Sequence, residues 1–447
     1  MTYNTSIGYE EGFGMDTSIR SMAAEARKAA LELASASLEK RNKVLLAIAD
    51  QIEKNIERLL LVNAQDVEAA QKEGLSTPLL NRLKLNTSKC MGMAEGLRSL
   101  ALLPDPLGHV QYAKELSPGL NLYRVACPIG VIGVIFESRP DALIQISSLC
   151  LKSGNAVLLK GGREALRTNE LLTELIVEAS KAVGLPEGWC GLLHSREDVQ
   201  EMLKQHDLID LIIPRGSNAF VRYIMQNSEI PVLGHADGLC HVYVDDGCDI
   251  TEAVKVAVDS KTQNLSVCNA AETMLVHRNI APVFLPLVKT ELEKRGVELR
   301  GDARTQNLIT CNAATEEDWK TEYLDSILSI KVVDSLMDAV EHINHYGSHH
   351  TDCILSRNPA SINAFMTLVD SADVFANCST RFADGFRFGF GAEVGIATGK
   401  IHARGPMGME GLCTYKYRLY GSGQTLEELN QGCYSLTHSD LEPKLPE

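Results

Sequence analysis

The chain has 447 residues, and its 43 basic and 58 acidic side chains give a formal net charge of −15 at pH 7. This balance argues against a partner such as nucleic acid or an anionic membrane surface, because those contacts need clustered Lys and Arg. Hydrophobic residues make up 45% and charged residues 23% of the chain, which is ordinary globular composition. The length indicates two or three domains with hydrophobic cores and excludes a wholly disordered chain.

The first 20 residues are polar and acidic, without the basic start and apolar core of a secretory signal. No stretch approaches the roughly 18 uninterrupted apolar residues of a membrane-spanning helix. The twelve cysteines form no C-x-x-C pair and no ligand spacing to a histidine, so neither a metal site nor a disulfide framework is indicated. We therefore expect a cytoplasmic protein with reduced thiols and no metal.

The chain begins with a helical pattern over residues 16–74. Apolar residues recur there at spacings of three and four, with Ser37 available as an N-cap. We expect these helices to pack on a sheet formed later in the chain. A Pro118-Gly119 turn signal within residues 112–125 predicts a hairpin, and the apolar run 129–136 predicts a strand buried on both faces.

Strand and helix patterns then alternate, which is typical of doubly wound α/β architecture with ligands beyond the carboxyl ends of the strands. Helices are expected near residues 167–183 and 218–225, no internal repeat is evident, and the segment after residue 421 is the low-order part of the chain. The expected strands are 156–159, 208–213, 241–244, 273–276, 327–333 and 353–355.

A dinucleotide site is the first expectation for such a fold, yet G-x-G-x-x-G is absent after the first strand. An alternative anion site is the turn Pro214-Arg215-Gly216-Ser217, which follows a strand and precedes a helix. Backbone N–H groups at that helix start could hold a phosphate. Taken alone, the simpler interpretation is that Ser217 only caps the helix.

A second anion site is indicated at Lys160-Gly161-Gly162-Arg163, directly after a buried strand. The glycines remove side chains and the two cations supply charge-assisted donors, a combination that suits a phosphorylated ribose. A solvated basic loop would give the same pattern.

Among the cysteines, Cys268 stands apart by its setting. A polar stretch, Gln263-Asn264-Leu265-Ser266, precedes it, and a helix-compatible segment leading to a strand follows it. A thiol near a helix N-terminus is favoured as a thiolate by the local dipole. On the residues alone, a buried inert thiol remains the simpler interpretation.

Several long segments carry a family resemblance. Over about residues 18–421, in the same order, the chain resembles the gamma-glutamyl phosphate reductases of the aldehyde dehydrogenase superfamily. It also resembles the reductase half of bifunctional pyrroline-5-carboxylate synthases, without the kinase half. The segments are GVIGVIFESRPDALIQISSLCLKSGNAVLLKGG, DLIIPRGSNAFVRYI, KTQNLSVCNAAETMLVH and STRFADGFRFGFGAEVGIATGKIHARGPMGMEGL.

The resemblance implies a role for several residues. Cys268 matches the nucleophile that accepts the glutamyl group, and Lys160 matches the lysine that contacts the adenosine ribose. Gly216 and Ser217 match the turn and helix start under the pyrophosphate of NADP, with Gly161, Arg163 and Arg215 as further cofactor residues. Because this superfamily binds its dinucleotide without the usual fingerprint, the resemblance accounts for its absence.

For the substrate, L-glutamyl 5-phosphate, the resemblance offers Arg139, Asn269, Arg381 and Arg387 as binding residues, although each arginine could equally form a structural ion pair. Most bacterial relatives have Asn where this chain has Asp141. An ionised Asp cannot donate to an oxyanion, so either this carboxyl is protonated or turned away, or backbone N–H groups such as that of Cys268 stabilise the charge.

The resemblance also implies the domain organisation, and it invites comparison with the oxidative aldehyde dehydrogenases. An NADP-binding domain would span 1–111 and 127–234, a catalytic domain 235–400, and oligomerisation strands 112–126 and 408–421, followed by the tail 422–447, which we expect to be dispensable for chemistry. Oxidative aldehyde dehydrogenases carry a hydrolytic Glu in an E-L-G-G segment. Here His235 lies near that position and no Glu is present.

The expected activity is NADPH-dependent reduction of the acyl phosphate through a cysteine thioester, in proline biosynthesis. The alternatives are an oxidative aldehyde dehydrogenase and a catalytically silent oligomeric family member. NADPH is expected to be preferred because Arg163 stands where NAD-preferring relatives have a Glu that would repel a 2′-phosphate. The expected partners are a separate glutamate kinase and further copies of the chain, as a dimer or tetramer.

Overall fold

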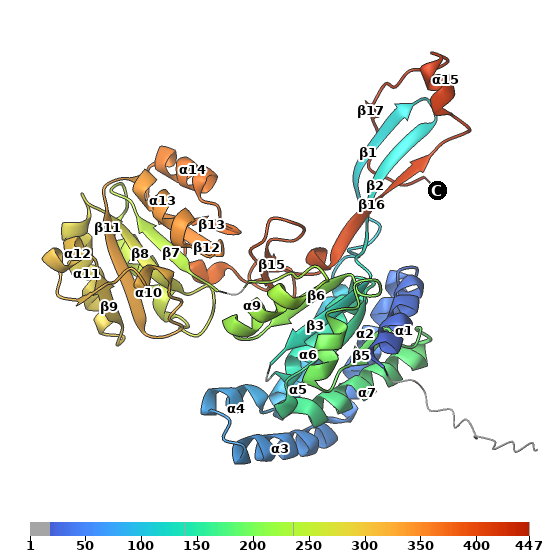
Figure 1. Cartoon of the computed structure of the whole chain (residues 1–447), viewed down its shortest axis with the longest axis horizontal. Coiled ribbons are helices and arrows are strands. Elements are labelled where there is room, and N and C mark those ends of the chain that lie inside the picture. Colours follow the sequence, from blue (N-terminus) through green and yellow to red (C-terminus); the bar gives the residue numbers. More distant parts are fainter. Residues whose placement is uncertain (1–17, 138, 236, 447) are drawn as a thin grey trace, which may run out of the picture.

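The computed structural model describes residues 18–137, 139–235 and 237–446. They form two lobes, each built on a parallel sheet, and an antiparallel arm that projects away from both lobes (Figure 1). The predicted α/β architecture is therefore confirmed. The first 17 residues, with which the predicted cofactor domain and helical pattern begin, lie outside the described part. None of the described helices has the length and apolar character needed to cross a membrane.

The first lobe contains a four-stranded parallel sheet in the order β5-β4-β3-β6. Every residue of β3 and β4 is buried, as expected for strands covered on both faces. The strands are β3 (Val131–Phe136), β4 (Ala156–Lys160), β5 (Cys190–Leu192) and β6 (Leu211–Arg215). The helices that follow them are α6 (Pro140–Lys152), α7 (Leu166–Val183), α8 (Arg196–Met202) and α9 (Asn218–Asn227), with a short 3-10 turn, η1 (Arg163–Ala165).

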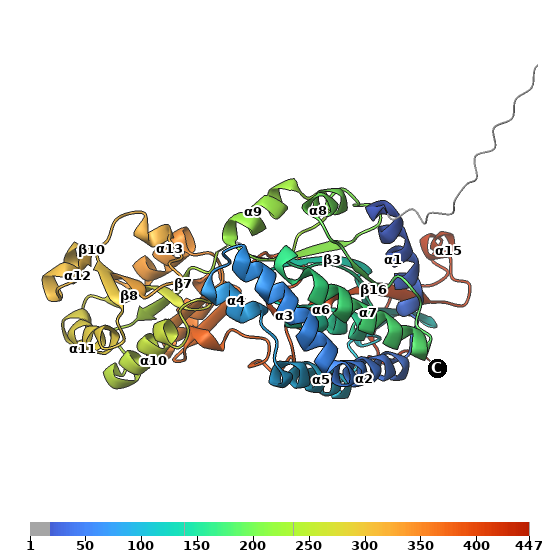
Figure 2. The same cartoon turned by 90° about the horizontal axis from the view of Figure 1, so that it is seen from below.

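The N-terminal helices pack against this sheet, as the sequence predicts. Ser37 accepts a hydrogen bond from the Lys40 N–H and caps α2. Val44 and Ile48 of α2 are buried in the same core as Val131 of β3, and α2 lies against α5 and α7 (Figure 2). These helices are α1 (Ile19–Leu33), α2 (Leu38–Lys54), α3 (Ile56–Lys72), α4 (Thr77–Leu83) and α5 (Thr87–Leu102).

The second lobe contains a seven-stranded parallel sheet in the order β10-β9-β11-β8-β7-β12-β13. The four strands predicted for this part of the chain are confirmed. The strands are β7 (Cys240–Val244), β8 (Ala271–His277), β9 (Glu298–Gly301), β10 (Asn312–Ala313), β11 (Ile327–Val333), β12 (Thr351–Leu355) and β13 (Asp373–Ala376). Its helices are α10 (Ile250–Thr262), α11 (Ala281–Glu293), α12 (Ala303–Leu308), α13 (Leu336–Tyr346) and α14 (Pro359–Leu368), with η2 (Asp318–Lys320) before β11.

Residues 377–412 lead from the second lobe to the arm. They contain η3 (Thr380–Phe382), η4 (Glu410–Leu412) and an antiparallel pair, β14 (Gly395–Ala397) with β15 (Gly405–Met407). Val394, Ala397 and Met407 pack into the core of the first lobe. This segment therefore ties the two lobes together.

The arm is a four-stranded antiparallel sheet in the order β16-β2-β1-β17 (Figure 1). The predicted hairpin is confirmed, and Gly119 supplies the positive φ of its turn. The elements are β1 (Val110–Ser117), β2 (Leu120–Pro128), β16 (Cys413–Tyr420), α15 (Leu426–Asn430) and β17 (Ser439–Asp440). Exposed side chains on β16, among them Tyr415, Tyr417 and Leu419, suit a role in assembly, which stays a prediction.

The tail after residue 421 is more ordered than the sequence indicated. It forms α15 and then returns along the hairpin, where β17 pairs with β1. Leu441 and Leu445 pack against the buried residues of the arm. The prediction of a low-order tail is therefore wrong for this part, because hydrophobic residues spaced within a polar segment find their partners only after the hairpin has formed.

Candidate active site

Cys268 lies in a turn between the end of α10 and the start of β8. The expectation that a helix begins next to this residue is wrong, because Ala271 already starts β8. A dipole from a following helix therefore does not act on the thiol, and its reactivity must come from groups on other segments.

Three segments meet around Cys268, each placed just before a strand of the second lobe. His235 precedes β7, Cys268 precedes β8, and His350 immediately precedes β12. The doubly wound architecture predicted ligands beyond the carboxyl ends of the strands. This cluster instead gathers at the amino ends of β7, β8 and β12.

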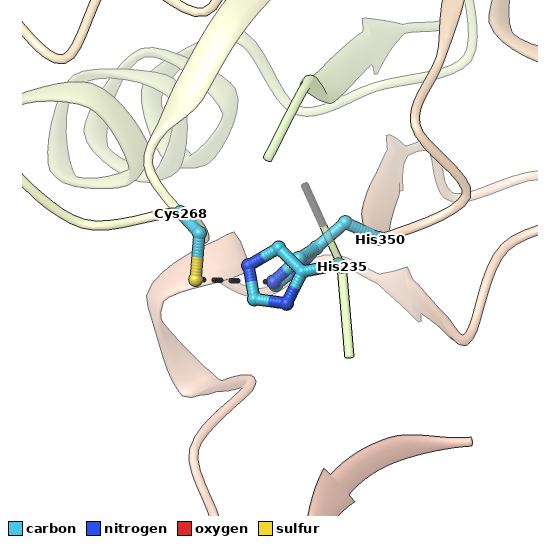
Figure 3. A group of neighbouring side chains, drawn as sticks. All are labelled: His235, Cys268 and His350. Carbon is cyan, nitrogen blue, oxygen red and sulfur yellow. Dashed lines mark hydrogen bonds between the residues drawn. The ribbon is translucent and has the colours of Figure 1, made fainter. Parts of the chain in front are cut away.

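His350 is paired with the thiol. Its Nε2 lies 3.2 Å from Cys268 Sγ (Figure 3), and its ring is fully buried. The other ring nitrogen, Nδ1, lies 2.8 Å from Thr351 Oγ1, and this hydroxyl donates to Asp373 Oδ2 at 3.4 Å. Since the hydroxyl donates to a carboxylate, it accepts from Nδ1–H and leaves Nε2 to receive the thiol proton. A nucleophile, a base and a group that orients the base are thus in line.

A close approach of two backbone segments brings Cys268 into this position. A Cβ added to Gly238 would lie 2.1 Å from the carbonyl oxygen of Cys268 and 2.5 Å from its Cα. Only glycine allows that approach. The Cys240 thiol, at the start of β7, donates to the same carbonyl oxygen at 3.2 Å, so Gly238 and Cys240 together hold the backbone of the nucleophile.

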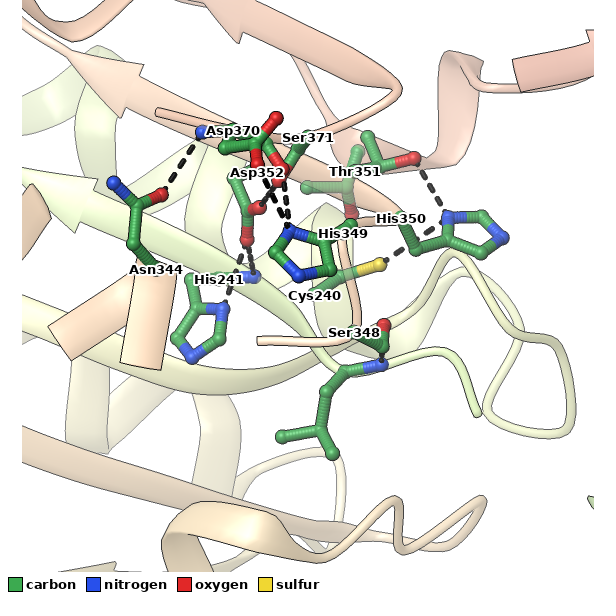
Figure 4. A network of polar contacts seen from close by, with 12 residues as sticks. Cys240, His241, Asn344, Ser348, His349, His350, Thr351, Asp352, Asp370 and Ser371 are labelled. Atoms are coloured by element: carbon green, nitrogen blue, oxygen red, sulfur yellow. Dashed lines mark hydrogen bonds and ion pairs between the residues drawn. The ribbon is translucent and has the colours of Figure 1, made fainter. Parts of the chain in front are cut away.

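The loop that carries His350 is held by polar contacts on both sides (Figure 4). Ser348 Oγ accepts from the Leu239 N–H at 2.8 Å. His349 has a positive φ of 60°, and its Nδ1 lies 2.5 Å from the carbonyl oxygen of Asp370. Asp352, just beyond the loop, accepts from both the backbone N–H and Nδ1 of His241, each at 2.8 Å. These contacts fix the loop before any ligand binds.

Buried thiols elsewhere in the chain differ from Cys268 in their surroundings. Burial raises the pKa of Cys240, Cys353, Cys150 and Cys190, which keeps these groups protonated and unreactive at neutral pH. Cys268 is only partly buried. It therefore combines access with a base, which the other four thiols lack.

Two guanidinium groups lie within electrostatic reach of Cys268. Arg215 ends β6 in the first lobe and Arg381 lies in η3, where its Nε donates to Gln263 Oε1 at 2.9 Å. Burial lowers the pKa of both guanidinium groups, and the nearby Cys268 acts in the opposite direction. The nucleophile of the second lobe thus lies near a guanidinium group, Arg215, that belongs to the first lobe.

The structure places the other predicted substrate residues at the edge of this region. Arg139 Nη2 lies 3.7 Å from Asp141 Oδ2, and Asp141 also acts on Arg215, so its carboxyl group faces cations. Arg387 donates to the carbonyl oxygen of Arg381 at 3.1 Å and forms an ion pair with Asp384 at 3.4 Å. The assignments of Arg139 and Arg387 to substrate stay predictions.

Asn269 follows the nucleophile and is buried. Its Nδ2 donates to the carbonyl oxygen of Ala383 at 2.8 Å, while its Oδ1 is buried without a hydrogen-bond partner in the described part of the chain. An unpaired buried acceptor is costly. A donor from a bound molecule would therefore be favoured at this position.

The predicted ribose site lies at the carboxyl end of β4. Lys160 is buried, its Nζ donates to the carbonyl oxygen of Gly161 at 2.5 Å, and burial lowers its pKa although Glu164 and Asp198 act in the opposite direction. A bound anion would offset the free-energy cost of burying the charged Lys160 ammonium. Arg163 is exposed and forms an ion pair with Glu73 at 2.6 Å.

The predicted pyrophosphate site lies at the start of α9. A Cβ on Gly216 would lie 3.0 Å from Glu137 Cδ and from Phe220 Cδ1. The Ser217 N–H bonds to the Glu137 carboxylate, whose pKa burial nevertheless raises. Ser217 occupies the N-cap position of α9, but its side chain makes no capping hydrogen bond. Its backbone N–H is directed at an acid instead.

Sequence reasoning missed His350, Thr351, Asp373 and Glu137. His350 follows another histidine before a short strand, and no spacing links it to Cys268, 82 residues earlier. Glu137 lies within a segment that resembles the family, and no spacing or charge pattern distinguishes it there. His235 was noticed for the loss of a glutamate, but not for its nearness to the nucleophile.

Comparisons with known proteins agree with one another. The model of the aldehyde dehydrogenase family matches residues 13–313. The chain is 54% identical to a gamma-glutamyl phosphate reductase from Acetivibrio thermocellus over 96% of this chain and 100% of that protein. It is 57% identical to one from Pelotomaculum thermopropionicum over 90% of this chain and 93% of that protein.

A solved structure adds agreement in three dimensions. The crystal structure of a gamma-glutamyl phosphate reductase from Thermotoga maritima superposes with a TM-score of 0.89 at 40% identity, covering 91% of this chain and 99% of that chain. Both the sequence and the arrangement of the lobes are thus shared along nearly the whole length.

Replacing Gly238 by Ala is expected to slow alkylation of Cys268 by iodoacetamide about tenfold or more, because the added Cβ must push the Cys268 backbone away from His350. Gly234→Ala is the matched control, since its added Cβ finds its nearest atoms at 3.6 Å. Alkylation rates measured by mass spectrometry, with thermal unfolding to confirm folding, decide the matter. Equal rates in both variants would contradict the proposed packing.

Replacing His350 by Asn is expected to lower the alkylation rate of Cys268 at neutral pH by about 10²-fold, the lower range for loss of a general base. His345→Asn, in the last turn of α13, is the control and should leave the rate within about twofold. A wild-type rate in the His350 variant would show that the imidazole does not take the thiol proton.

Proposed function

The chain belongs to the aldehyde dehydrogenase family and, within it, to the gamma-glutamyl phosphate reductases, and from this premise we propose how its residues reduce the acyl phosphate. The family and the aldehyde-dehydrogenase-like fold predicted from the sequence are confirmed. The enzyme is an oxidoreductase of proline biosynthesis that converts L-glutamyl 5-phosphate into L-glutamate 5-semialdehyde and phosphate. The observation that carries the proposal is the contact between Cys268 Sγ and His350 Nε2 at 3.2 Å.

Covalent catalysis by Cys268 suits this substrate. A free carboxylate resists reduction, whereas an acyl phosphate has a good leaving group. In the proposed first step the Cys268 thiol gives its proton to His350 Nε2, and the sulfur attacks the acyl carbon. The bond from that carbon to the phosphate oxygen breaks, phosphate leaves, and the glutamyl group remains on sulfur as a thioester.

Nearby cations support the charge that develops in this step. Arg215 and Arg381 act on Cys268 and suit the phosphate or the substrate carboxylate. The oxyanion is expected to bind the backbone N–H of Cys268, because Asp141 faces Arg139 and has no proton to donate when ionised. The unpaired Oδ1 of Asn269 suits the substrate ammonium.

Members of this family use NAD(P), and the residues of the first lobe fit such a group. The buried Lys160 gains from an anion, and the N–H groups at the start of α9 suit a pyrophosphate, provided that Glu137 is protonated or turns away. The cofactor supplies a hydride when bound. His350 would then retain the thiol proton until the sulfur is released from the aldehyde.

The oxidative alternative has less support. The lost E-L-G-G glutamate leaves His235 near its place, and His235 Nδ1–H donates to the carbonyl oxygen of Ile396 at 2.8 Å. A catalytically silent protein is disfavoured by the intact pairing of Cys268 with His350 and by 54% identity to a named reductase. The acyl-phosphate reductase therefore remains the favoured function.

The setting of the enzyme in the cell follows from its chemistry. We place it in the cytoplasm, because all twelve cysteines are free. Its substrate is a reactive acyl phosphate, which favours supply by a separate glutamate kinase near the site. The exposed face of β16 favours a homo-oligomer, a dimer or tetramer.

Replacing Cys268 by Ala is expected to abolish phosphate- and NADP-dependent oxidation of glutamate semialdehyde, the back reaction, while cofactor binding and thermal unfolding stay near wild type. Cys433→Ala removes the exposed thiol of the tail and is the control, with activity within about twofold of wild type. Turnover by the Cys268 variant, or failure of wild type to require phosphate, would contradict the thioester route.

Replacing Arg163 by Glu is expected to weaken NADPH binding about tenfold or more and to leave NADH binding largely unchanged, because a charge-assisted contact to the 2′-phosphate contributes about 1.5–3 kcal/mol. Glu73→Gln releases Arg163 from its ion pair and should not weaken NADPH. Fluorescence titration with both cofactors tests this. If both weaken equally, or neither does, Arg163 is not the selector.

A further inference from the structure

The three side chains that meet at the amino ends of β7, β8 and β12 form a donor set for a transition metal. One ligand atom each from His235, Cys268 and His350 lies within 4.8 Å of the other two, and Figure 3 shows the Cys268 sulfur next to the two imidazole rings. Two imidazoles and a thiolate are the ligands that zinc prefers. We propose that these residues form a Zn²⁺ site whose occupancy reversibly blocks the nucleophile.

The hydrogen bonds of the two histidines support this assignment. His235 Nδ1 lies 2.8 Å from the carbonyl oxygen of Ile396, which can only accept, so Nδ1 carries the proton and Nε2 keeps its lone pair. His350 Nδ1 bonds to Thr351 Oγ1 and likewise leaves Nε2 directed at Cys268. Metal-bound histidines typically donate their other N–H to a protein oxygen in this way.

The distances allow closure around a metal with a modest movement. Tetrahedral zinc, with bonds of about 2.0–2.1 Å to nitrogen and about 2.3 Å to sulfur, places its ligand atoms about 3.3–3.6 Å apart. Cys268 Sγ and His350 Nε2 are already 3.2 Å apart. His235 is partly exposed and His350 is buried, so a small shift of the His235 ring that keeps its hydrogen bond to Ile396 would complete the set.

The surrounding charges work in both directions. Arg215 and Arg381 act on Cys268 and oppose a cation, whereas Glu393 acts on Arg215 and reduces that opposition. A thiolate ligand neutralises part of the metal charge. Three protein ligands leave one tetrahedral position for water or an anion.

Zinc binding would change the state of the nucleophile. The thiol proton is released, the sulfur lone pair is engaged by the metal, and no electrons are transferred. Cys268 would then be unable to attack an acyl carbon until a chelator removed the metal. This consequence rests on the proposed function, whereas metal binding itself does not.

The test begins with metal-free full-length protein titrated with Co²⁺. The expected result is about one Co²⁺ per chain with a thiolate-to-cobalt charge-transfer absorption, displaced by Zn²⁺. Cys268→Ser should lose that absorption, and His235→Ala should weaken zinc, measured by competition with a chromophoric chelator, by at least about tenfold. Unchanged zinc affinity in both variants would overturn the site.

Two controls keep the outcome specific. His206→Ala removes an exposed histidine that is paired with Glu229. Cys240→Ser removes a thiol that lies 3.7 Å from His350 Nδ1. Both should retain the cobalt absorption, and loss in Cys240→Ser but not in Cys268→Ser would overturn the ligand assignment. Circular dichroism and thermal unfolding establish that each variant is folded.

The activity measurement separates the regulatory claim from the proposed function. Zn²⁺ should inhibit the back reaction of wild type in step with its binding, and a chelator should restore the rate. Metal bound through Cys268 without inhibition would overturn the block. A protein that gives the cobalt absorption on titration, yet never turns over in its metal-free form, would instead contradict the proposed function.

Discussion

The pairing of the Cys268 sulfur with the His350 imidazole requires the amino ends of three parallel strands to meet in one place. Gly238 makes this possible, because any side chain there would collide with the Cys268 carbonyl group. The hydrogen bond between Asp352 of β12 and His241 of β7 then holds these two neighbouring strands together inside the sheet. Packing and buried hydrogen bonds thus set the geometry of the nucleophile, since a base is useful only within hydrogen-bond distance of its proton.

In the proposed mechanism, the two sheets contribute opposite ends to the site. Lys160 and Arg215 end β4 and β6 of the first sheet, whereas Cys268 and His350 precede β8 and β12 of the second. Arg215 nevertheless interacts electrostatically with Cys268. A cation at the carboxyl end of the first sheet therefore lies near the nucleophile at the amino end of the second. This arrangement allows a cofactor and a covalent substrate to be held by different lobes while sharing one set of charges.

The arrangement that prepares Cys268 for catalysis also exposes it to inhibition by a bound metal. A thiol beside two imidazoles whose Nδ1 groups are both engaged is suited to proton transfer and, for the same reason, to metal binding. The neighbouring guanidinium groups favour anionic substrate over a cation, which biases the cluster toward catalysis. Whether the nucleophile or the metal ligand prevails is then a matter of metal supply, since both uses need the same sulfur.

The sequence by itself determined the central strands of both parallel sheets, the early helices with their Ser37 cap, the hairpin at Gly119, and the family, because these depend on local periodicity, turn chemistry and long matching segments. The short strands at or near the sheet edges, such as β5, β9 and β13, were not predicted. The tertiary structure alone decided that His350 is the partner of Cys268, that a strand rather than a helix follows Cys268, and that the tail returns to β1. Each of these depends on residues far apart in the chain, such as Cys268 and His350, separated by 82 positions. Contacts of that kind arise only when strand order and loop packing are fixed, and no spacing in the sequence encodes them.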